Sequence, residues 1–356
     1  MNIIYVITGL KIGGAETQVS SIIDKMFAMG HTVTLISLTG TVCISPKSNV
    51  EIISLGLNKR PLSLMKAIVD IRRIIINKQP DVVHSHMIHA NILTRLVRIF
   101  CPIKKLVCTA HSNFEGAGVI NKIYRYTNFL SDVFTNVSHT AIDSFIEQGI
   151  VKKDEMKCVY NGVDFKRFSF SSVDRGFIRK EFGIGESTKL LLAVGRLTEA
   201  KDYPNLLRAM SLILDDDDSV KLIIVGDGEL KGNIYQSILD LDLEENVMLV
   251  GSRHDVERFM SAADCLVIAS RWEGFGLVAV EAFGCGCPVV ATDCGGMKEI
   301  VGNGVVPVSD HYALAREVMA VFSSNDKVSY DKCREVVMTK FDLDSIARKW
   351  ISIYKS

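Results

Sequence analysis

A glycine-rich stretch with two carboxylates, residues 270–299, carries the residue types best suited to ligand chemistry. An apolar run over residues 265–269 leads into it and predicts a buried strand. Gly274 and Gly276 allow a tight turn, and the small, apolar residues that follow predict a helix beginning near Gly276. Free N–H groups and the helix dipole at such a helix start favour anions. The stretch therefore predicts a backbone site for phosphate.

Two carboxylates, Glu273 and Glu281, flank this turn. Carboxylates repel phosphate, so we assign these two side chains to neutral hydroxyl groups. A pocket that takes both phosphate and many hydroxyl groups suits a sugar nucleotide. The carboxylate pair and the glycine turn together predict that class of ligand.

Two cations, Arg196 and Lys201, follow another predicted buried strand, residues 189–195. A helix is predicted over residues 204–214, because Pro204 suits a first helical turn. Arginine can bind two oxygens at once, and lysine supplies a point charge. We interpret the two cations as a clamp for a diphosphate.

The first half of the chain has a glycine loop after its first predicted strand. Gly9, Gly13 and Gly14 follow an apolar run over residues 3–7, but their spacing does not fit the G-x-G-x-x-G fingerprint of dinucleotide binding. The loop either presents backbone N–H groups to a ligand or is a tight turn and nothing more. The missing fingerprint disfavours a dehydrogenase.

Histidines mark the ends of two further predicted strands in the same half. His86 and His111 stand where strands end, which is where ligands bind in open α/β sheets. Titratable residues at such ends are site candidates. His84, His86 and His89 also suggest a metal site, but no clear acidic partner accompanies them, so we disfavour metal binding there.

Strands and helices alternate through both halves, which is typical of doubly wound parallel sheets and predicts two Rossmann-like α/β domains. Predicted strands cover residues 3–7, 32–37, 52–54, 81–86, 105–109, 136–138, 189–195, 221–225, 247–250, 265–269 and 288–292. A first predicted helix follows the glycine loop and ends near Met29, and further predicted helices cover residues 62–77, 91–100, 140–148, 204–214, 255–262 and 345–354. We assign residues 1–165 to an N-terminal domain and residues 166–340 to a C-terminal domain, with a polar linker over residues 166–175. The aromatic last helix is expected to dock and not to fray.

Length and composition agree with a protein of two well-buried domains. The chain has 356 residues, 48% of them hydrophobic, and no apolar run reaches the length of a membrane span. Residues 1–7 lack a basic leader, so they predict a strand and not a signal peptide. Nine scattered cysteines in mostly apolar segments suit reduced, buried thiols in a cytoplasmic protein.

Charge is balanced overall but not along the chain. Residues 1–165 hold 18 Lys and Arg against 12 Asp and Glu, whereas residues 166–356 hold 23 against 29. A basic first half favours an anionic partner, and in the absence of a nucleic-acid motif we expect a membrane surface or a phosphorylated lipid. Residues 121–130 interleave basic and aromatic side chains, which favours either a surface that rests on a bilayer or an ordinary amphipathic helix.

Taken together, these motifs resemble the retaining glycosyltransferases of family 4, which have the two-domain GT-B architecture. The resemblance spans nearly the whole chain and rests on the order of its motifs: residues 13–16, His111, residues 161–164, residues 194–196 with Lys201, residues 226–228, Glu273 with Glu281, residues 288–290, residues 295–296 and Glu299. Relatives often carry a second histidine or an aromatic residue beside His111, where this chain has Ser112 and Asn113. In such enzymes a C-terminal helix, here expected within residues 341–356, crosses back onto the first domain.

The resemblance implies a role for each matched residue. Arg196 and Lys201 would bind the donor diphosphate, Glu281 the ribose hydroxyls, and Glu273 the sugar hydroxyls. Arg253 and His254 would frame the nucleobase, while Gly14 and His111 would close over the phosphate and sugar. The implied catalytic residues are Arg196, Lys201, Glu273 and His111, and the implied substrate-binding residues are Gly13, Gly14, Gly228, Arg253, His254, Gly274, Phe275, Gly276, Leu277 and Glu281.

The resemblance also implies a reaction that needs no metal and no other cofactor. The cations and the helix start would stabilise the charge that develops on the leaving diphosphate. We expect transfer of a hexose-type sugar, with retention, from a nucleotide-diphosphate sugar to a hydroxyl of a growing glycan. A UDP donor is favoured, and a lipid-diphosphate-linked O-antigen or capsule repeat is the expected acceptor, reached from the inner face of the cytoplasmic membrane. A non-hydrolysing sugar-nucleotide epimerase and a catalytically silent binding subunit are the alternatives.

Overall fold

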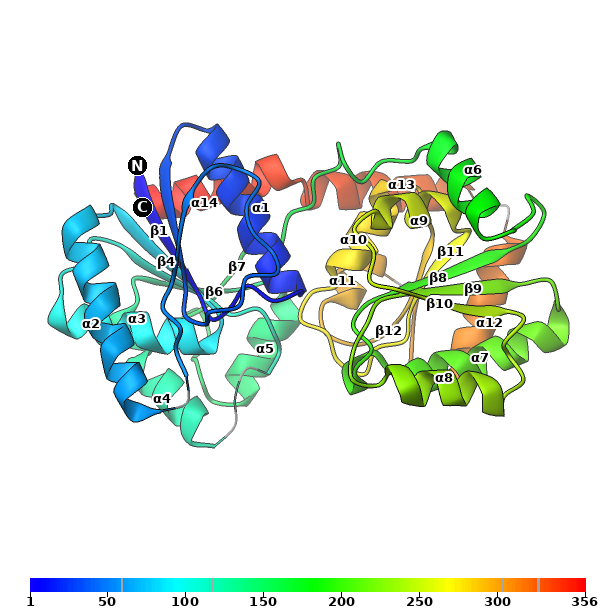
Figure 1. The fold of residues 1–356 in the computed structure, drawn as a ribbon, viewed down its shortest axis with the longest axis horizontal. Coiled ribbons are helices and arrows are strands. Elements are labelled where there is room, and N and C mark those ends of the chain that lie inside the picture. The colour runs from blue at the N-terminus through cyan, green and yellow to red at the C-terminus, as the bar shows by residue number, and fades with distance from the viewer. Residues whose placement is uncertain (59, 115, 117, 303, 325–326) are drawn as a thin grey trace. The chain divides into compact units, whose positions relative to one another are not determined.

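A computed structural model describes residues 1–58, 60–114, 116, 118–302, 304–324 and 327–356 (Figure 1). The chain divides into two compact units. The first contains Met1–Gly162 and Leu343–Ser356, and the second contains Val163–Asp342. Across these described residues, no helix has the length and apolar character needed to cross a bilayer.

Among the described residues, the first unit is built on a seven-stranded sheet in which all neighbouring strands are parallel. The strands are β1 (Asn2–Ile7), β2 (Thr32–Ser37), β3 (Glu51–Ser54), β4 (Val82–His86), β5 (Leu106–Thr109), β6 (Val133–Asn136) and β7 (Lys157–Cys158). Their order is β3-β2-β1-β4-β5-β6-β7. The order therefore reverses between β1 and β4, as in a doubly wound fold.

Helices cover both faces of this sheet, which explains why its central strands β1 and β4 are buried on both sides. The helices are α1 (Gly14–Ala28), α2 (Pro61–Lys78), α3 (Ile88–Phe100), α4 (Val119–Thr127), the 3-10 turn η1 (Asn128–Leu130), α5 (His139–Glu147) and α14 (Leu343–Lys355). One core joins the sheet to α1 and α14, and the other joins it to α2, α3 and α5. Figure 1 shows α1 and α14 side by side, as their contacts require.

The last helix docks as the sequence predicts for an aromatic C-terminal segment. Trp350 and Tyr354 are buried in the first unit. The Tyr354 hydroxyl lies 2.9 Å from the Tyr5 hydroxyl and 2.6 Å from His84 Nδ1. Lys25 of α1 pairs with Asp344 at 2.6 Å. Although α14 is last in sequence, it is part of the core of the first unit.

The second unit repeats the plan, with a six-stranded parallel sheet among its described residues in the order β10-β9-β8-β11-β12-β13. Its strands are β8 (Leu190–Val194), β9 (Lys221–Val225), β10 (Val247–Gly251), β11 (Cys265–Ile268), β12 (Val289–Thr292) and β13 (Val305–Val306). Its helices are α6 (Ser172–Glu181), η2 (Glu199–Lys201), α7 (Tyr203–Asp216), α8 (Lys231–Asp240), α9 (Val256–Ala262), α10 (Leu277–Gly284), α11 (Met297–Val301), α12 (His311–Ser323) and α13 (Lys327–Lys340). The two sheets confirm the prediction of two Rossmann-like domains.

Two predicted segments differ from the structure. The sixth strand lies at Val133–Asn136 and not at residues 136–138, because Ser138 instead caps α5 by accepting a hydrogen bond from the Ala141 N–H. The expected linker contains the start of α6, where Ser171 accepts a hydrogen bond from the Asp174 N–H. In both segments a serine caps the start of a helix: Ser138 stands where the sequence predicted the end of a strand, and Ser171 where it predicted a linker.

Candidate functional site

The sheet of the second unit has its order reversal between β8 and β11, which pair directly. Ligands in open α/β sheets bind beside such a reversal, at the carboxyl ends of the strands. The loop after β8 spans residues 195–198, and the loop after β11 spans residues 269–276. These loops contain Arg196, Glu273 and the glycine turn, and Lys201 follows in η2.

Lys201 and Glu273 meet at this reversal. Lys201 Nζ bonds to Glu273 Oε1, and the Ser270 hydroxyl donates to the same oxygen at 2.9 Å. The aliphatic part of the Lys201 side chain lies against Gly195, because a Cβ placed on Gly195 would be 3.0 Å from Lys201 Cε. The two charged side chains remain 23% and 16% exposed, so a ligand can reach the pair.

A second ion pair, which the sequence did not predict, fastens the same two loops together. Arg271 lies 3.0 Å from the buried carboxylate of Asp202, which also accepts a hydrogen bond from the Ser309 hydroxyl at 2.7 Å. The Arg271 N–H donates to the Ala200 carbonyl at 2.8 Å. Asp202 directly follows Lys201, and Arg271 lies close before Glu273 in the chain. This second ion pair therefore keeps the two loops of the candidate site together.

Arg196 has no ion pair or side-chain hydrogen bond with any residue that the structure describes, and it is exposed. The loop carrying it is held by the loop after β9. The Leu197 N–H donates to the Asp227 carbonyl at 3.0 Å, and a Cβ on Gly228 would lie 2.5 Å from the Leu197 carbonyl oxygen. The Arg196 guanidinium is thus available to a ligand. The absence of a side chain at Gly228 allows its backbone to approach that of Leu197 closely.

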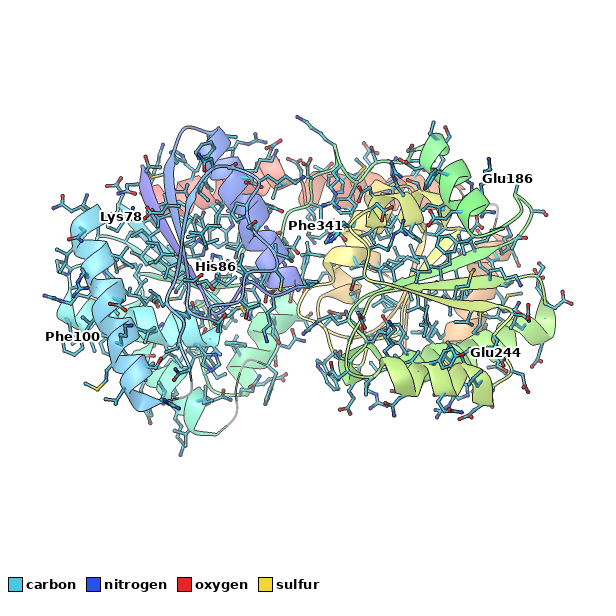
Figure 2. The ribbon with its side chains drawn as sticks, in the orientation of Figure 1. Lys78, His86, Phe100, Glu186, Glu244 and Phe341 are labelled. Atoms are coloured by element: carbon cyan, nitrogen blue, oxygen red, sulfur yellow. The ribbon has the colours of Figure 1, made fainter. Side chains whose placement is uncertain are left out.

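The predicted helix start after the glycine turn is confirmed. Gly276 has φ of 97° and precedes α10, and a Cβ there would lie 2.0 Å from the terminal carbon of Met297. Phe275 is buried and meets Phe341 edge-on at 5.3 Å between ring centroids; Figure 2 labels Phe341. Phe275 therefore anchors the turn, and Leu277 is the first residue of the helix.

Glu281 lies one turn into α10 in a different environment from Glu273. The pKa of its carboxyl group is raised to about 7, mainly by burial; the charge of Arg167 opposes this shift, and the charge of Glu257 adds to it. Arg167 itself pairs with Glu257 at 2.9 Å. Neither Arg167 nor Glu257 was a predicted site residue, because they lie far from Glu281 in the sequence.

Arg253 and His254 differ in how their side chains are used. Arg253 forms two 2.9 Å bonds with Asp255, and this pairing raises the pKa of the guanidinium. It also lies over the Phe259 ring at 5.1 Å. His254 is exposed, and its carbonyl accepts a bond from Arg167 at 2.8 Å. Arg253 thus shapes the loop, whereas the imidazole of His254 faces solvent.

The predicted site residues of the first unit follow β1 and β5, the two strands on either side of β4. Gly13 is the N-cap of α1, Gly14 begins that helix, and His111 follows β5. His111 Nε2 lies 2.9 Å from Nδ1 of His86, which ends β4. Burial lowers the pKa of His111 to about 4, so the imidazole is neutral at physiological pH.

The three histidines that suggested a metal site have different surroundings. Both ring nitrogens of His84 are engaged, with Tyr354 at 2.6 Å and Thr109 at 2.7 Å, and His89 is exposed. Within the described ranges, no group of three or more His, Cys, Asp or Glu side chains is arranged to hold a metal ion.

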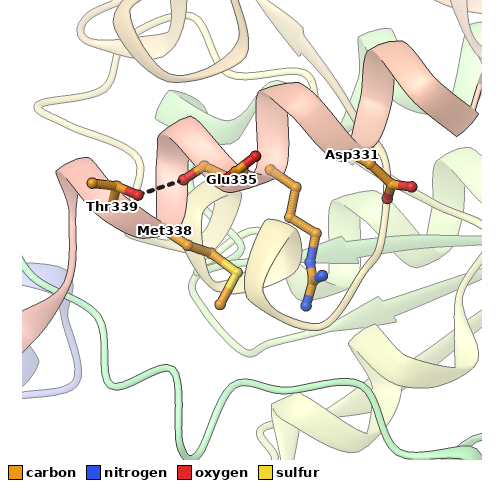
Figure 3. A pocket seen from close by; sticks show the side chains of 5 residues that line it. Asp331, Glu335, Met338 and Thr339 are labelled. Carbon is orange, nitrogen blue, oxygen red and sulfur yellow. Dashed lines mark hydrogen bonds between the residues drawn. The ribbon is translucent and has the colours of Figure 1, made fainter.

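The residues that line a surface pocket in the second unit are not among the predicted site residues. Figure 3 shows its lining side chains on one helix: Asp331, Arg334, Glu335, Met338 and Thr339. Arg334 donates to the carbonyls of Phe283 and Gly284 at 2.8 and 3.0 Å. A cation on the last carbonyls of α10 stabilises the end of that helix, so we interpret this pocket as structural.

Comparison with known proteins identifies the family. The model described as Glycosyltransferase Family 4 matches residues 12–167, and the model described as Glycosyl transferases group 1 matches residues 174–335. The N-acetyl-alpha-D-glucosaminyl L-malate synthase of Bacillus anthracis is 30% identical over 66% of this chain and 62% of its own length. The UDP-Gal:alpha-D-GlcNAc-diphosphoundecaprenol alpha-1,3-galactosyltransferase of Escherichia coli is 26% identical over 67% of this chain and 64% of its own.

The fold itself is that of a solved structure. Anabaena HepE, in complex with UDP, superposes with a TM-score of 0.86 over 100% of both chains at 22% sequence identity. The two curated relatives are matched over slightly less than two thirds of their own length. Two consecutive family models that cover most of the chain, together with this fold, show that the chain belongs to family 4 of the GT-B glycosyltransferases.

Proposed function

We propose that this protein transfers a sugar, with retention of configuration, from a nucleotide-diphosphate sugar to a hydroxyl group of a growing glycan. The observation that carries the proposal is the pairing of Lys201 with Glu273 at the order reversal of the second sheet, next to the start of α10. A cation, a carboxylate and a helix N-terminus at one edge can bind a phosphate together with hydroxyl groups.

The diphosphate is the leaving group, and negative charge grows on it as its bond to the sugar breaks. Arg196 is exposed at this edge, and Lys201 is accessible beside it. These two cations and the N–H groups at the start of α10, near Gly274 and Gly276, would stabilise that charge where it develops. Such stabilisation requires charged and polar groups that are in position before the bond breaks. The ion pair between Arg271 and Asp202 keeps the loops that carry these groups together.

The carboxylates and the first unit would supply the remaining contacts. Glu273 would accept hydrogen bonds from sugar hydroxyls, and Glu281 from the ribose. The loop at Arg253 and His254 would frame the nucleobase, and Gly14 and His111 would contact the phosphate and sugar. These assignments rest on the family resemblance and on the chemistry of each side chain.

Retention follows from a proposed attack on the face that the leaving group vacates. In that geometry a phosphate oxygen of the leaving group takes the proton of the acceptor hydroxyl, so no separate base on the protein is needed. Neutral His111 fits this scheme, because it would be a hydrogen-bonding partner and not the base.

The proposed substrates are based on those named for similar proteins. The Anabaena structure contains UDP, and the name of the Escherichia coli relative specifies a UDP-linked donor and a diphosphoundecaprenol-linked acceptor. We therefore propose a UDP-hexose donor and a lipid-diphosphate-linked glycan, such as an O-antigen or capsule repeat. Such an acceptor would place the protein on the inner face of the cytoplasmic membrane.

A face of the first unit suits contact with such a membrane. Exposed apolar side chains gather on α2, α3, α4 and the residues after it: Leu62, Met65, Phe100, Val119, Tyr126 and Phe129. Figure 2 shows Phe100 at the rim of this unit. Exposed cations lie among them: Lys66, Arg72, Arg73, Lys122 and Arg125. We propose that this face, called the α2–α4 face, rests on anionic lipid.

Removing one cation of the clamp should impair turnover far more than folding. Lys201→Ala or Arg196→Ala is expected to lower kcat by roughly two to three orders of magnitude, the scale of losing one preorganised charge-stabilising donor. The rates are measured with radiolabelled UDP-sugars and an acceptor extract, after a thermal-shift screen has selected the donor. Lys180→Ala, on the exposed side of α6, is the control. Near-normal turnover of Lys201→Ala would overturn the assignment.

Chelation should leave the activity unchanged. Since the cations and helix start are proposed to stabilise the leaving group, dialysis against EDTA is expected to preserve the transfer rate within about twofold. Activity that EDTA abolishes and Mg²⁺ restores would contradict the metal-free mechanism.

The α2–α4 face should bring the chain to anionic vesicles at low salt. Each exposed aromatic ring that enters the interface contributes on the order of 1.5 kcal/mol or more, so Tyr126→Ala with Phe129→Ala should reduce the bound fraction about tenfold or more in flotation. Phe177→Ala with Tyr235→Ala, two exposed aromatic residues of the second unit, is the matched control. Wild-type protein that stays with the soluble fraction would refute membrane contact.

Glu281 should make the stability of the fold depend on pH. Its folded pKa of about 7 exceeds the ordinary value of 4.5, so the folded state binds the extra proton and loses stability as pH rises from about 4.5 through 7. Glu281→Gln removes this loss. It should match wild type near pH 4.5 and exceed it at pH 8, by at most about 3 kcal/mol.

Urea unfolding at the two pH values measures this difference. Glu244→Gln, an exposed residue of the same unit, should show no such pH dependence. If Glu281→Gln and wild type have equal stability at pH 8, the carboxyl group is not held in a destabilising environment.

A further inference from the structure

The Glu273 carboxylate is held through only one of its two oxygens among the described residues. Oε1 accepts a hydrogen bond from the Ser270 hydroxyl at 2.9 Å and another from the Lys201 ammonium group. Oε2 forms no hydrogen bond or ion pair with any residue that the structure describes. Each carboxylate oxygen can accept about two hydrogen bonds, so Oε1 is fully used while Oε2 is available to a ligand.

The direction of the Ser270 bond follows from the charges. Glu273 forms an ion pair with Lys201, and an ionised carboxylate can only accept hydrogen bonds, so the Ser270 hydroxyl is the donor. Ser270 is fully buried, and Glu273 is the one acceptor that its hydroxyl has among the described residues. A buried hydroxyl that donates to a charged group forms one of the stronger kinds of hydrogen bond. This bond therefore restrains the Glu273 side chain.

The backbone at both ends of this bond is anchored from β12 and the turn after it. The Thr292 hydroxyl donates to the Ser270 carbonyl at 2.5 Å, and Thr292 is the fully buried last residue of β12, the strand that pairs with β11. A Cβ on Gly295 would lie 2.0 Å from the Glu273 carbonyl oxygen. With both backbones in place, the remaining freedom of Glu273 is rotation of its side chain, which the Ser270 hydroxyl limits.

Lys201 is less suited to fix this carboxylate. Its ammonium group has several N–H donors on a long, flexible side chain, and it is proposed to bind the diphosphate. It can contact phosphate and Glu273 together or turn wholly toward the phosphate. Ser270 has a short side chain on an anchored backbone and no proposed contact with the substrate. Its bond to Glu273 can persist in either case.

We infer that Ser270 is a positioning residue that holds Glu273 by Oε1 and so presents Oε2 to the hydroxyl groups of the donor sugar. An oxygen with free lone pairs accepts hydrogen bonds from such hydroxyls. Without the Ser270 hydroxyl, the carboxylate would rotate and be aligned with the sugar for less of the time. The inference rests on the proposed function for the identity of this sugar, whereas the bond between Ser270 and Glu273 can be tested without any ligand.

Thermal unfolding of the full chain tests the bond by a double-mutant cycle. Ser270→Ala should lower the thermal midpoint of the wild type by about 4 °C or more, the scale of one hydrogen bond to a charged group. In a Glu273→Ala background the hydroxyl has already lost its acceptor, so the same change should lower the midpoint by less than about 1 °C or raise it. Equal decreases in both backgrounds would refute the bond.

Binding of UDP, UDP-glucose and UDP-galactose, measured by calorimetry, tests the positioning role. Ser270→Ala should raise the Kd of the UDP-hexose that the wild type binds about tenfold, because its sugar loses alignment with Glu273. The Kd of UDP should change by less than about twofold, because UDP has no sugar for Oε2 to meet. In the Glu273→Ala background, Ser270→Ala should have no further effect. A general structural defect would instead weaken UDP and the UDP-hexose alike, and that result would overturn the positioning role.

A matched control removes a similar bond elsewhere in the same unit. The Ser219 hydroxyl donates to Asp217 at 2.7 Å just before β9, at the opposite edge of the sheet from the candidate site. Ser219→Ala should leave both Kd values unchanged. If Ser270→Ala does not fold, Ser270→Cys takes its place, because a thiol is a weaker donor of similar size and should give a smaller loss of the same selectivity.

The outcomes separate this inference from the proposed function. Wild type that binds the UDP-hexose, with a Kd that Ser270→Ala leaves unchanged, would refute the positioning role while supporting the proposed donor. Wild type that binds neither UDP-hexose would contradict the proposed donor and the presentation of Oε2 to its sugar. The thermal cycle would then still decide whether Ser270 holds Glu273.

Discussion

The bond between Lys201 and Glu273 depends on a constraint of the whole second sheet. The two residues come from loops that follow β8 and β11, strands that are adjacent although much of the unit separates them in sequence. On either side of these two strands the crossovers run in opposite directions, so the loops part and leave room at the edge. A cation and a carboxylate can then share this edge without being covered by a helix.

Close backbone approach keeps this edge compact. A Cβ on Gly226 would lie 1.9 Å from the Gly195 carbonyl oxygen, and one on Gly295 would lie 2.0 Å from that of Glu273. Both glycines have positive φ, so a side chain at either would meet steric overlap as well as backbone strain. The glycines at these loops therefore bring the loops after neighbouring strands into contact, while the charged side chains between them face outward.

The sequence predicts most of the architecture because central parallel strands are buried on both faces and read as apolar runs. Strands with buried polar residues break this rule. The strand β6 contains Thr135 and Asn136, both buried, and the sequence predicted its first residue three positions too late. The segment from β13 to α13 has no comparable pattern, and no element was predicted there. Helix starts with a capping serine, such as Ser171, were also missed within polar sequence.

At the candidate site, the sequence identifies residues but not their partners. Lys201 and Glu273 were each assigned by type, yet their direct bond and the supporting pair of Arg271 with Asp202 require the adjacency of β8 and β11. The same holds for Glu281, whose environment includes Arg167 and Glu257.

The candidate site residues of the two units also differ in their charge. The site of the second unit is built from paired charges, whereas the histidines of the first are neutral because burial removes their charge. A charged group at an open edge can stabilise a leaving diphosphate. A neutral imidazole carries no charge to stabilise a leaving group; one of its nitrogens donates a hydrogen bond and the other accepts one. The Tyr354 hydroxyl lies within hydrogen-bond distance of both Tyr5 and His84, so this residue of α14 contributes hydrogen bonds to the first unit as well as packing.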